Sequence, residues 1–134
     1  MKAYVADTHS LIWHLQGNPR LSSRVRSIFS RADSSKASIV VPTIVLVEMT
    51  YLAEKKRIAD TLLKASLALL RRAGESYLLA PLDLAVVDVL ERAPRSPVPD
   101  MPDRIIAATA LCLGLPLLSR DRDMAAVVGL KVIW

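Results

Sequence analysis

Short apolar runs alternate along the chain with longer segments in which apolar residues recur at helical spacing. The short runs predict strands at 2–6, 38–41, 77–79, 115–118 and 131–133. The longer segments predict helices at 11–15, 22–31, 42–56, 57–73, 83–92 and 103–113, with a helical turn near 124–128. Strands that alternate with helices favour an α/β fold, with a central, mostly parallel sheet flanked by helices.

Prolines and glycines set the expected limits of these elements. The proline-rich stretch from position 94 to Pro102 predicts a loop that no helix crosses. Gly74 and Gly114 are expected to end the two helices that precede them. No internal repeat or linker interrupts the pattern, so we expect one domain over residues 1–134.

Composition narrows the class of protein. The chain has 134 residues, 52% of them hydrophobic, which is enough for one well-packed core. No apolar run approaches the roughly 20 residues that cross a bilayer, and the first residues do not resemble a signal peptide. The single cysteine, Cys112, forms no internal disulfide, which favours a reducing cytoplasm and no membrane association. The net charge of +5 fits either a polyanionic partner or a merely solubilising surface.

Two acidic residues directly follow predicted strands. Asp7 comes after the first strand, and Asp121 comes three residues after Leu118 in the fourth. The carboxyl ends of parallel strands meet at one edge of a sheet, where ligands bind in open α/β folds. We therefore expect these two carboxylates to lie on the same side of the sheet.

Two further acids lie on predicted helices. Glu48 shares the apolar face of its helix with Ile44 and Leu52, where an unpaired carboxylate would be costly to bury. It is therefore protonated, paired with a residue such as arginine, or bound to a cation. Asp103 begins a helix and is either a capping residue or a site acid, and Asp100 has the same two interpretations.

A cluster of such acids suits a divalent cation. Neighbouring carboxylates repel one another, and a hard cation such as Mg²⁺ relieves that repulsion and prefers oxygen ligands. A bound cation can activate water and stabilise the charge on a phosphodiester. Arg104, Arg120 and Arg122 flank the acids and would either grip phosphate or neutralise the carboxylates. Acids that hold metal within a basic protein are the combination expected of a nuclease.

Four motifs, in order along the whole chain, resemble the PIN domain, specifically the VapC-type toxins of bacterial toxin–antitoxin pairs. They are Val-Ala-Asp7-Thr-His-Ser-Leu-Ile-Trp, Val-Glu48-Met, Pro-Asp100-Met-Pro-Asp103-Arg-Ile-Ile-Ala-Ala-Thr-Ala and Leu-Leu-Ser119-Arg-Asp121. The resemblance implies a helix-flanked α/β sheet and cleavage of RNA that depends on Mg²⁺, with Mn²⁺ as a substitute. It also implies a cognate antitoxin as partner and a homodimer.

The same resemblance assigns roles to individual residues. It implies that the catalytic and metal-binding acids are Asp7, Glu48, Asp103 and Asp121. Ser119 retains a hydroxyl at a position that is commonly threonine in these toxins. Asp100 and Asp123 are additional acids nearby, to which we assign a supporting role. Asp103 is preferred to Asp100 as the ligand because a helix holds it more rigidly than a loop would.

Two other functions compete with this interpretation. One is a phosphohydrolase that uses Asp7 as its nucleophile, although such enzymes usually carry a second acid where this chain has His9. The other is a non-catalytic module of the same fold that binds RNA or protein. His9 and His14 are five residues apart, which is not the spacing of a helical metal pair, and Cys112 is expected in the core.

Overall fold

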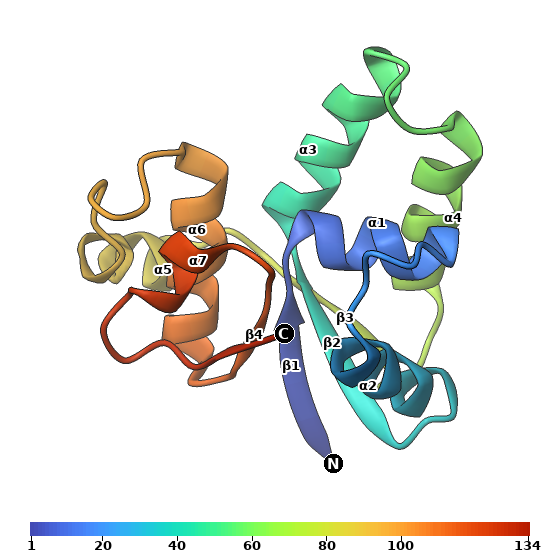
Figure 1. Ribbon diagram of the computed structural model, residues 1–134, viewed down its shortest axis with the longest axis horizontal. Coiled ribbons are helices and arrows are strands. Elements are labelled where there is room, and N and C mark those ends of the chain that lie inside the picture. The colour runs from blue at the N-terminus through green and yellow to red at the C-terminus, as the bar shows by residue number, and fades with distance from the viewer.

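The computed structural model describes residues 1–134 and is built around a five-stranded sheet (Figure 1). The strands are β1 (Lys2–Ala6), β2 (Ala37–Pro42), β3 (Tyr77–Ala80), β4 (Leu117–Leu118) and β5 (Val132–Ile133). Their order is β3-β2-β1-β4-β5, and every neighbouring pair is parallel. The predicted α/β fold is confirmed, and the sheet is parallel throughout.

Helices cover both sides of this sheet. They are α1 (Thr8–Gln16), α2 (Ser23–Asp33), α3 (Thr43–Glu54), α4 (Asp60–Arg71), α5 (Leu84–Asp88), α6 (Met101–Leu113) and α7 (Arg122–Ala125), with a single 3₁₀ turn, η1 (Leu90–Arg92). Figure 1 shows α1 to α4 on one side and α5 to α7 on the other. None of these helices combines the length and the apolar character that a membrane crossing requires.

The sheet lies at the centre of one continuous apolar core. All six residues of β2 are buried, including the polar Ser38, so this strand shows no alternation of buried and exposed positions. Phe29, Leu11 and Met49 belong to this core and lie on α2, α1 and α3, and Ile106 belongs to it from α6. A sheet covered on both faces leaves only its edges and strand ends free for polar chemistry.

The strand order changes direction beside β1. The chain passes from β1 outward to β2 and β3, and then returns to place β4 on the other side of β1. The helices that follow β1 and β4 therefore diverge, which leaves a crevice at the carboxyl ends of these two strands. Asp7 and Ser119 are the residues that immediately follow the two strands.

Helix ends differ from prediction where side chains or prolines act locally. Helix α1 begins at Thr8 and not near position 11, because the Asp7 side chain accepts a hydrogen bond from the Ser10 amide and caps it. Pro102 was expected in a loop but lies in the first turn of α6, where its missing N–H leaves no bond unmade. Gly114 ends α6 with a φ of 65°, as predicted.

The second glycine prediction was wrong. Helix α4 already ends at Arg71, because Arg72 is extended, and Gly74 follows two residues later with a φ of 152°. Helix α4 also begins at Asp60, three residues later than expected. The predicted helix over 83–92 divides at Val89 into α5 and η1, although Asp83 caps its start as predicted.

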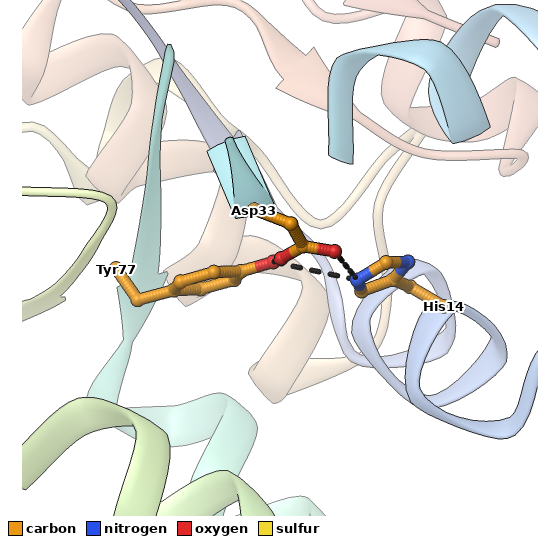
Figure 2. A network of polar contacts seen from close by, with 3 residues as sticks. All are labelled: His14, Asp33 and Tyr77. Carbon is orange, nitrogen blue, oxygen red and sulfur yellow. Dashed lines mark hydrogen bonds and ion pairs between the residues drawn. The ribbon is translucent and has the colours of Figure 1, made fainter. Parts of the chain in front are cut away.

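A polar network joins α1, α2 and β3 (Figure 2). The Tyr77 hydroxyl donates to Asp33 Oδ1 at 2.6 Å, and Asp33 Oδ2 lies 3.1 Å from His14 Nε2. The His14 ring also stacks on Phe29, with the ring centroids 4.2 Å apart. Burial lowers the pKa of His14 below 6.5, and the charge of Asp33 opposes that shift. The network fixes the ends of two helices against the sheet.

We expect Tyr77→Phe to lower the free energy of unfolding by about 1 kcal/mol, because it removes a donor to a partly exposed carboxylate. Urea denaturation at pH 7 measures the difference. Tyr51→Phe is the matched control, since the Tyr51 side chain is exposed and makes no hydrogen bond. Equal stabilities of the two variants would show that the network contributes nothing to the fold.

Candidate active site

The predicted site acids line one cavity at the carboxyl edge of the sheet. This cavity has a volume of about 480 Å³. Its lining consists of Asp7, Thr8, His9, Trp13, Glu48, Asp100, Asp103, Arg120 and Asp121. The structure therefore brings together all four acids singled out for the site, and it adds Asp100 to them. A larger cavity, of about 700 Å³, lies beside Asp33 and Tyr77 and has no comparable set of acids.

Asp7 is held rigidly at the end of β1. It is 8% exposed and caps α1, with Oδ1 accepting a hydrogen bond of 2.9 Å from the Ser10 amide. The Ser10 hydroxyl in turn donates to the carbonyl of Leu118 in β4, so β1 and β4 are tied together here. Burial raises the pKa of Asp7 above 3.8, while hydrogen bonds from Ser119 and Ser10 oppose the shift.

Glu48 points from α3 towards the first turn of α1. Its Oε1 accepts a short hydrogen bond from the Thr8 hydroxyl. The only salt bridge in the chain joins His14 and Asp33, so the expected alternative of an arginine partner for Glu48 is wrong. Burial raises the pKa of Glu48 above 4.5, and the nearby charges of Asp7 and Asp100 act in the same direction.

Asp103 lies in the first turn of α6 and is half-buried. Its pKa is raised from 3.8 to about 7, first by burial and then by the charges of Glu48, Asp121, Asp7 and Asp100. Neither Asp103 nor Asp100 makes a capping hydrogen bond, although Asp100 occupies the N-cap position. The capping interpretation is therefore wrong for both residues, and Asp103 instead lies within the field of the other acids.

Asp121 and Ser119 complete the edge after β4. Asp121 caps the short helix α7 by accepting a bond of 2.9 Å from the Asp123 amide. Its own amide donates to the Ser119 hydroxyl oxygen at 3.1 Å. Ser119 is 1% exposed and contacts both Asp7 and Asp121, which fits its expected supporting role. Asp123 is exposed and does not line the cavity.

Comparison of the sequence with known protein families identifies the family to which this chain belongs. The model of the PIN domain family matches residues 4–130, which is most of the chain and includes every acid of the cavity. The chain belongs to the PIN domain family. No curated protein sequence matches it.

Solved structures show the same PIN domain fold. VapBC2 from Rickettsia felis, bound to a DNA fragment from its promoter, gives a TM-score of 0.73 at 15% identity, covering 98% of this chain and 97% of that one. DNA-bound VapBC from Salmonella typhimurium gives 0.69 at 18% identity, with 99% and 98% covered. VapBC-5 from Mycobacterium tuberculosis gives 0.62 at 19% identity, with the same coverage. At these identities the likeness establishes the fold alone.

The three arginines near the acids of this PIN domain have different surroundings. Arg120 lines the cavity, whereas Arg122 is exposed outside it. Arg104 points elsewhere, because its Nε donates to the carbonyl of Ala93 at 2.8 Å and its Nη2 to that of Leu90 at 3.4 Å. None of the three forms a salt bridge, so the alternative in which they neutralise the carboxylates through salt bridges is wrong. Arg104 holds the η1 turn against α6, and only Arg120 is placed to meet a phosphate in the cavity.

The acids of this PIN domain fit a hard divalent cation by their donor chemistry. Five carboxylates line the cavity; burial raises the pKa of Asp7, and burial together with the charges of neighbouring carboxylates raises the pKa of Glu48 and Asp103. A cation at the cavity would relieve both. No group of three or more acidic, histidine or cysteine side chains is gathered closely enough to hold a metal ion. The carboxylates would therefore have to draw together when an ion binds.

Three residues of the lining were not predicted as part of the site. Thr8 and Trp13 were not considered for the site at all, and His9 was considered only as a metal ligand. Asp7 caps the helix that Thr8 begins, so residues of the first turn of α1 lie at the strand edge. Trp13 follows His9 by four residues and shares its helix face. Once His9 is placed at the strand edge, helical spacing counted from it finds Trp13.

Proposed function

We propose that this PIN domain is a metal-dependent endoribonuclease that hydrolyses RNA phosphodiester bonds with Mg²⁺, for which Mn²⁺ can substitute. The observation that carries the proposal is the convergence of five carboxylates, from four separate parts of the chain, on one cavity. A structural protein has no use for such an arrangement, because each buried acid opposes folding at neutral pH. A cation-dependent reaction on a phosphodiester needs it.

Each residue has a defined part in this reaction. We assign the ligand role to Asp7, Glu48, Asp103 and Asp121, which lie on the end of β1, on α3, on α6 and after β4. A divalent cation, when bound, activates water for attack on phosphorus and stabilises negative charge on the phosphoryl oxygens. Asp100 remains a supporting acid at the rim. Helices and strand ends fix the backbone positions of these residues, and their side chains must then draw together around an ion.

The hydroxyl groups and Arg120 orient the other participants. The Thr8 hydroxyl fixes the direction of the Glu48 carboxylate, and the Ser119 hydroxyl bonds the Asp7 carboxylate while it accepts from the Asp121 amide. Arg120 has no carboxylate partner although it lines an acidic cavity, so its guanidinium is available to a phosphate of the substrate. Arg122 lies farther out, where it can meet a more distant phosphate.

We further propose that the chain is the VapC-type toxin of a toxin–antitoxin pair, with a cognate antitoxin as partner, and that it forms a homodimer. The three solved structures compared above are VapBC assemblies, which supports a partner of the antitoxin kind. Exposed apolar side chains on α3, α5 and α6 supply surface for such contacts: Val47, Tyr51, Leu84, Val87 and Met101. Light scattering of the purified chain, alone and co-expressed with the neighbouring gene product, tests both assemblies.

The direct test of the enzyme is cleavage of end-labelled RNA by the purified chain. We expect cleavage in millimolar Mg²⁺ or Mn²⁺, none in EDTA, and none of a DNA strand of the same sequence. Cleavage that persists in EDTA would contradict the proposal. Binding of RNA without cleavage would favour the non-catalytic module, and release of phosphate from a phosphomonoester would favour the phosphohydrolase.

Glu48→Gln is expected to lower the rate of RNA cleavage about hundredfold, because the neutral amide is a poor ligand but keeps the shape and the hydrogen bond to Thr8. The melting temperature should stay the same or rise. Glu54→Gln is the matched control, since Glu54 is exposed at the end of the same helix. Equal cleavage rates for the two variants would remove Glu48 from the site.

A further inference from the structure

Beside the carboxylates, one wall of the cavity is aromatic. Trp13 is the single hydrophobic residue among the nine that line it, and His9 lies one helical turn earlier on α1. The two ring centroids are 5.5 Å apart, with the ring planes tilted by 53°. His9 is exposed and Trp13 is half-buried. An aromatic surface is thus presented next to the acids.

The core and the Trp134 ring hold the indole of Trp13 in place. It packs partly against the core, and the Trp134 ring meets it nearly edge-on at a centroid distance of 5.9 Å. Trp134 follows β5, so the carboxyl edge of the sheet itself supports the indole. A side chain fixed in this way loses little conformational freedom when a ligand stacks on it.

Two arginines stand over the same indole. The guanidinium carbons of Arg20 and Arg120 each lie 5.9 Å from a Trp13 ring centroid. Both side chains are exposed, and neither forms a salt bridge, although Arg120 lines the acidic cavity. An exposed cation–π contact is weak, about 0.5–1 kcal/mol, so it orients the guanidinium but is easily broken when a ligand binds. Each arginine can therefore exchange the ring for a phosphate, which it can bind in a bidentate manner.

The geometry points to a nucleotide subsite formed by Trp13, His9, Arg20 and Arg120, in which an unpaired base next to the cleaved phosphodiester stacks on the aromatic side chains. This inference rests on the proposed function for its ligand, RNA, and adds that the strand is single at the cleavage site. A stacking platform needs the face of a base, which a duplex buries between its neighbours. Arg20 and Arg120 would then hold the phosphates on either side of that base.

The decisive measurement is a thermodynamic cycle between Trp13 and the base, made in EDTA so that no RNA is cleaved. Fluorescence anisotropy gives the Kd of a hexa-adenylate RNA and of a hexamer that has the same backbone but no bases. The wild-type chain should bind the adenylate strand roughly tenfold more tightly, and Trp13→Leu should bind the two strands equally. If Trp13→Leu still discriminates as the wild type does, the subsite is wrong.

A second arm does not depend on whether Trp13→Leu folds. His9→Ala alters an exposed side chain and should reduce the preference for bases about threefold. Arg20→Gln and Arg120→Gln should weaken the binding of both hexamers, whereas Arg71→Gln, an exposed arginine on α4, should weaken neither. Unchanged binding in all three subsite variants would overturn the inference. So would equal affinity for a duplex of the same length, or tighter binding of a poly-glutamate peptide than of the RNA.

These results separate the subsite from the nuclease. Base-dependent binding through Trp13 in a chain that cleaves no RNA would leave the subsite standing and refute the proposed function. Cleavage of RNA that depends on Mg²⁺, with binding that does not depend on the base through Trp13, would support the proposed function and refute the subsite. In the Trp134→Phe background, where Trp13 is the remaining tryptophan, the adenylate strand should quench the fluorescence and the strand without bases should not.

Discussion

Asp103→Asn is expected to lower RNA cleavage about thousandfold and, at the same time, to raise the melting temperature of the metal-free protein. The loss follows from removing a charged ligand that a helix holds in place. The gain follows from the raised pKa of Asp103, about 7 against 3.8 in an unfolded chain. Asp103 makes the folded protein less stable, and a role in the proposed reaction explains why a carboxylate stands at this position.

The contribution of Asp103 to the free energy of unfolding depends on pH, because the folded and unfolded chains bind its proton differently. Between pH 4 and 7 the folded chain holds a proton on Asp103 that the unfolded chain has released, so stability falls as pH rises through this window. At pH 8 the full penalty remains, on the order of 1 kcal/mol after allowance for partial solvent exposure. Asp103→Asn removes it, which corresponds to several degrees in melting temperature. Comparing the two proteins at each pH cancels the opposite effect of His14, whose lowered pKa reduces stability as pH falls.

Asp100→Asn is the matched control for both measurements. Asp100 lines the same cavity from the N-cap position of the same helix, but it is exposed and makes no capping bond. We expect it to retain most of the cleavage rate and to melt with the wild type. Equal losses of activity in the two variants would mean that both acids serve the reaction. A larger loss in Asp100→Asn than in Asp103→Asn would mean that Asp100 is the ligand and Asp103 the supporting acid.

The second large effect concerns Mg²⁺ itself. A ligand that binds only the folded state stabilises it, by about 2.7 kcal/mol at a hundred times its Kd, which corresponds to roughly 10 °C for a chain of this size. The increase should be larger at pH 8 than at pH 6, because near pH 6 the ion must displace the proton on Asp103. Differential scanning fluorimetry with MgCl₂, against NaCl of equal ionic strength, measures this increase.

Asp103→Asn is again informative, because it should abolish the dependence of the Mg²⁺ effect on pH and reduce the effect itself. A melting curve that does not respond to millimolar Mg²⁺ at pH 8 would show that the carboxylates do not draw together around an ion. The proposed ligand set would then be wrong, whatever the outcome of the cleavage assays.

The sequence allowed the site to be predicted where a simple rule of the fold applied. Asp7 and Asp121 follow parallel strands, and the edge rule for such strands placed them together correctly. Glu48 was found because a carboxylate on an apolar helix face demands a special partner. That partner is the Thr8 hydroxyl, 40 residues away in sequence, and no local pattern specifies such a contact.

Other features lay beyond the sequence because they depend on tertiary packing. Arg104 looked equivalent to Arg120 in sequence, yet it turns away to donate to the carbonyl groups of Leu90, at the start of η1, and of Ala93, just after its end. Gly74 looked like a helix terminator, but α4 ended earlier because Arg72 was extended to lead towards β3. Nothing in the sequence singled out Trp13, and only the position of Trp134 and the cavity shows that one part of it faces outward.

The pairing of β1 with β4 has a consequence for when the enzyme becomes active. Asp7 is translated well before Asp121, and the bonds from Asp7 and Ser10 to the Leu118 carbonyl join these distant segments. A ribosome-bound chain that stops before β4 contains α1 to α6 but lacks Arg120 and Asp121 of the cavity. We therefore expect polypeptides released before β4 is made to lack the proposed activity, which arises only once β4 has paired with β1. A partner that inhibits this activity must therefore be present by the time β4 pairs with β1.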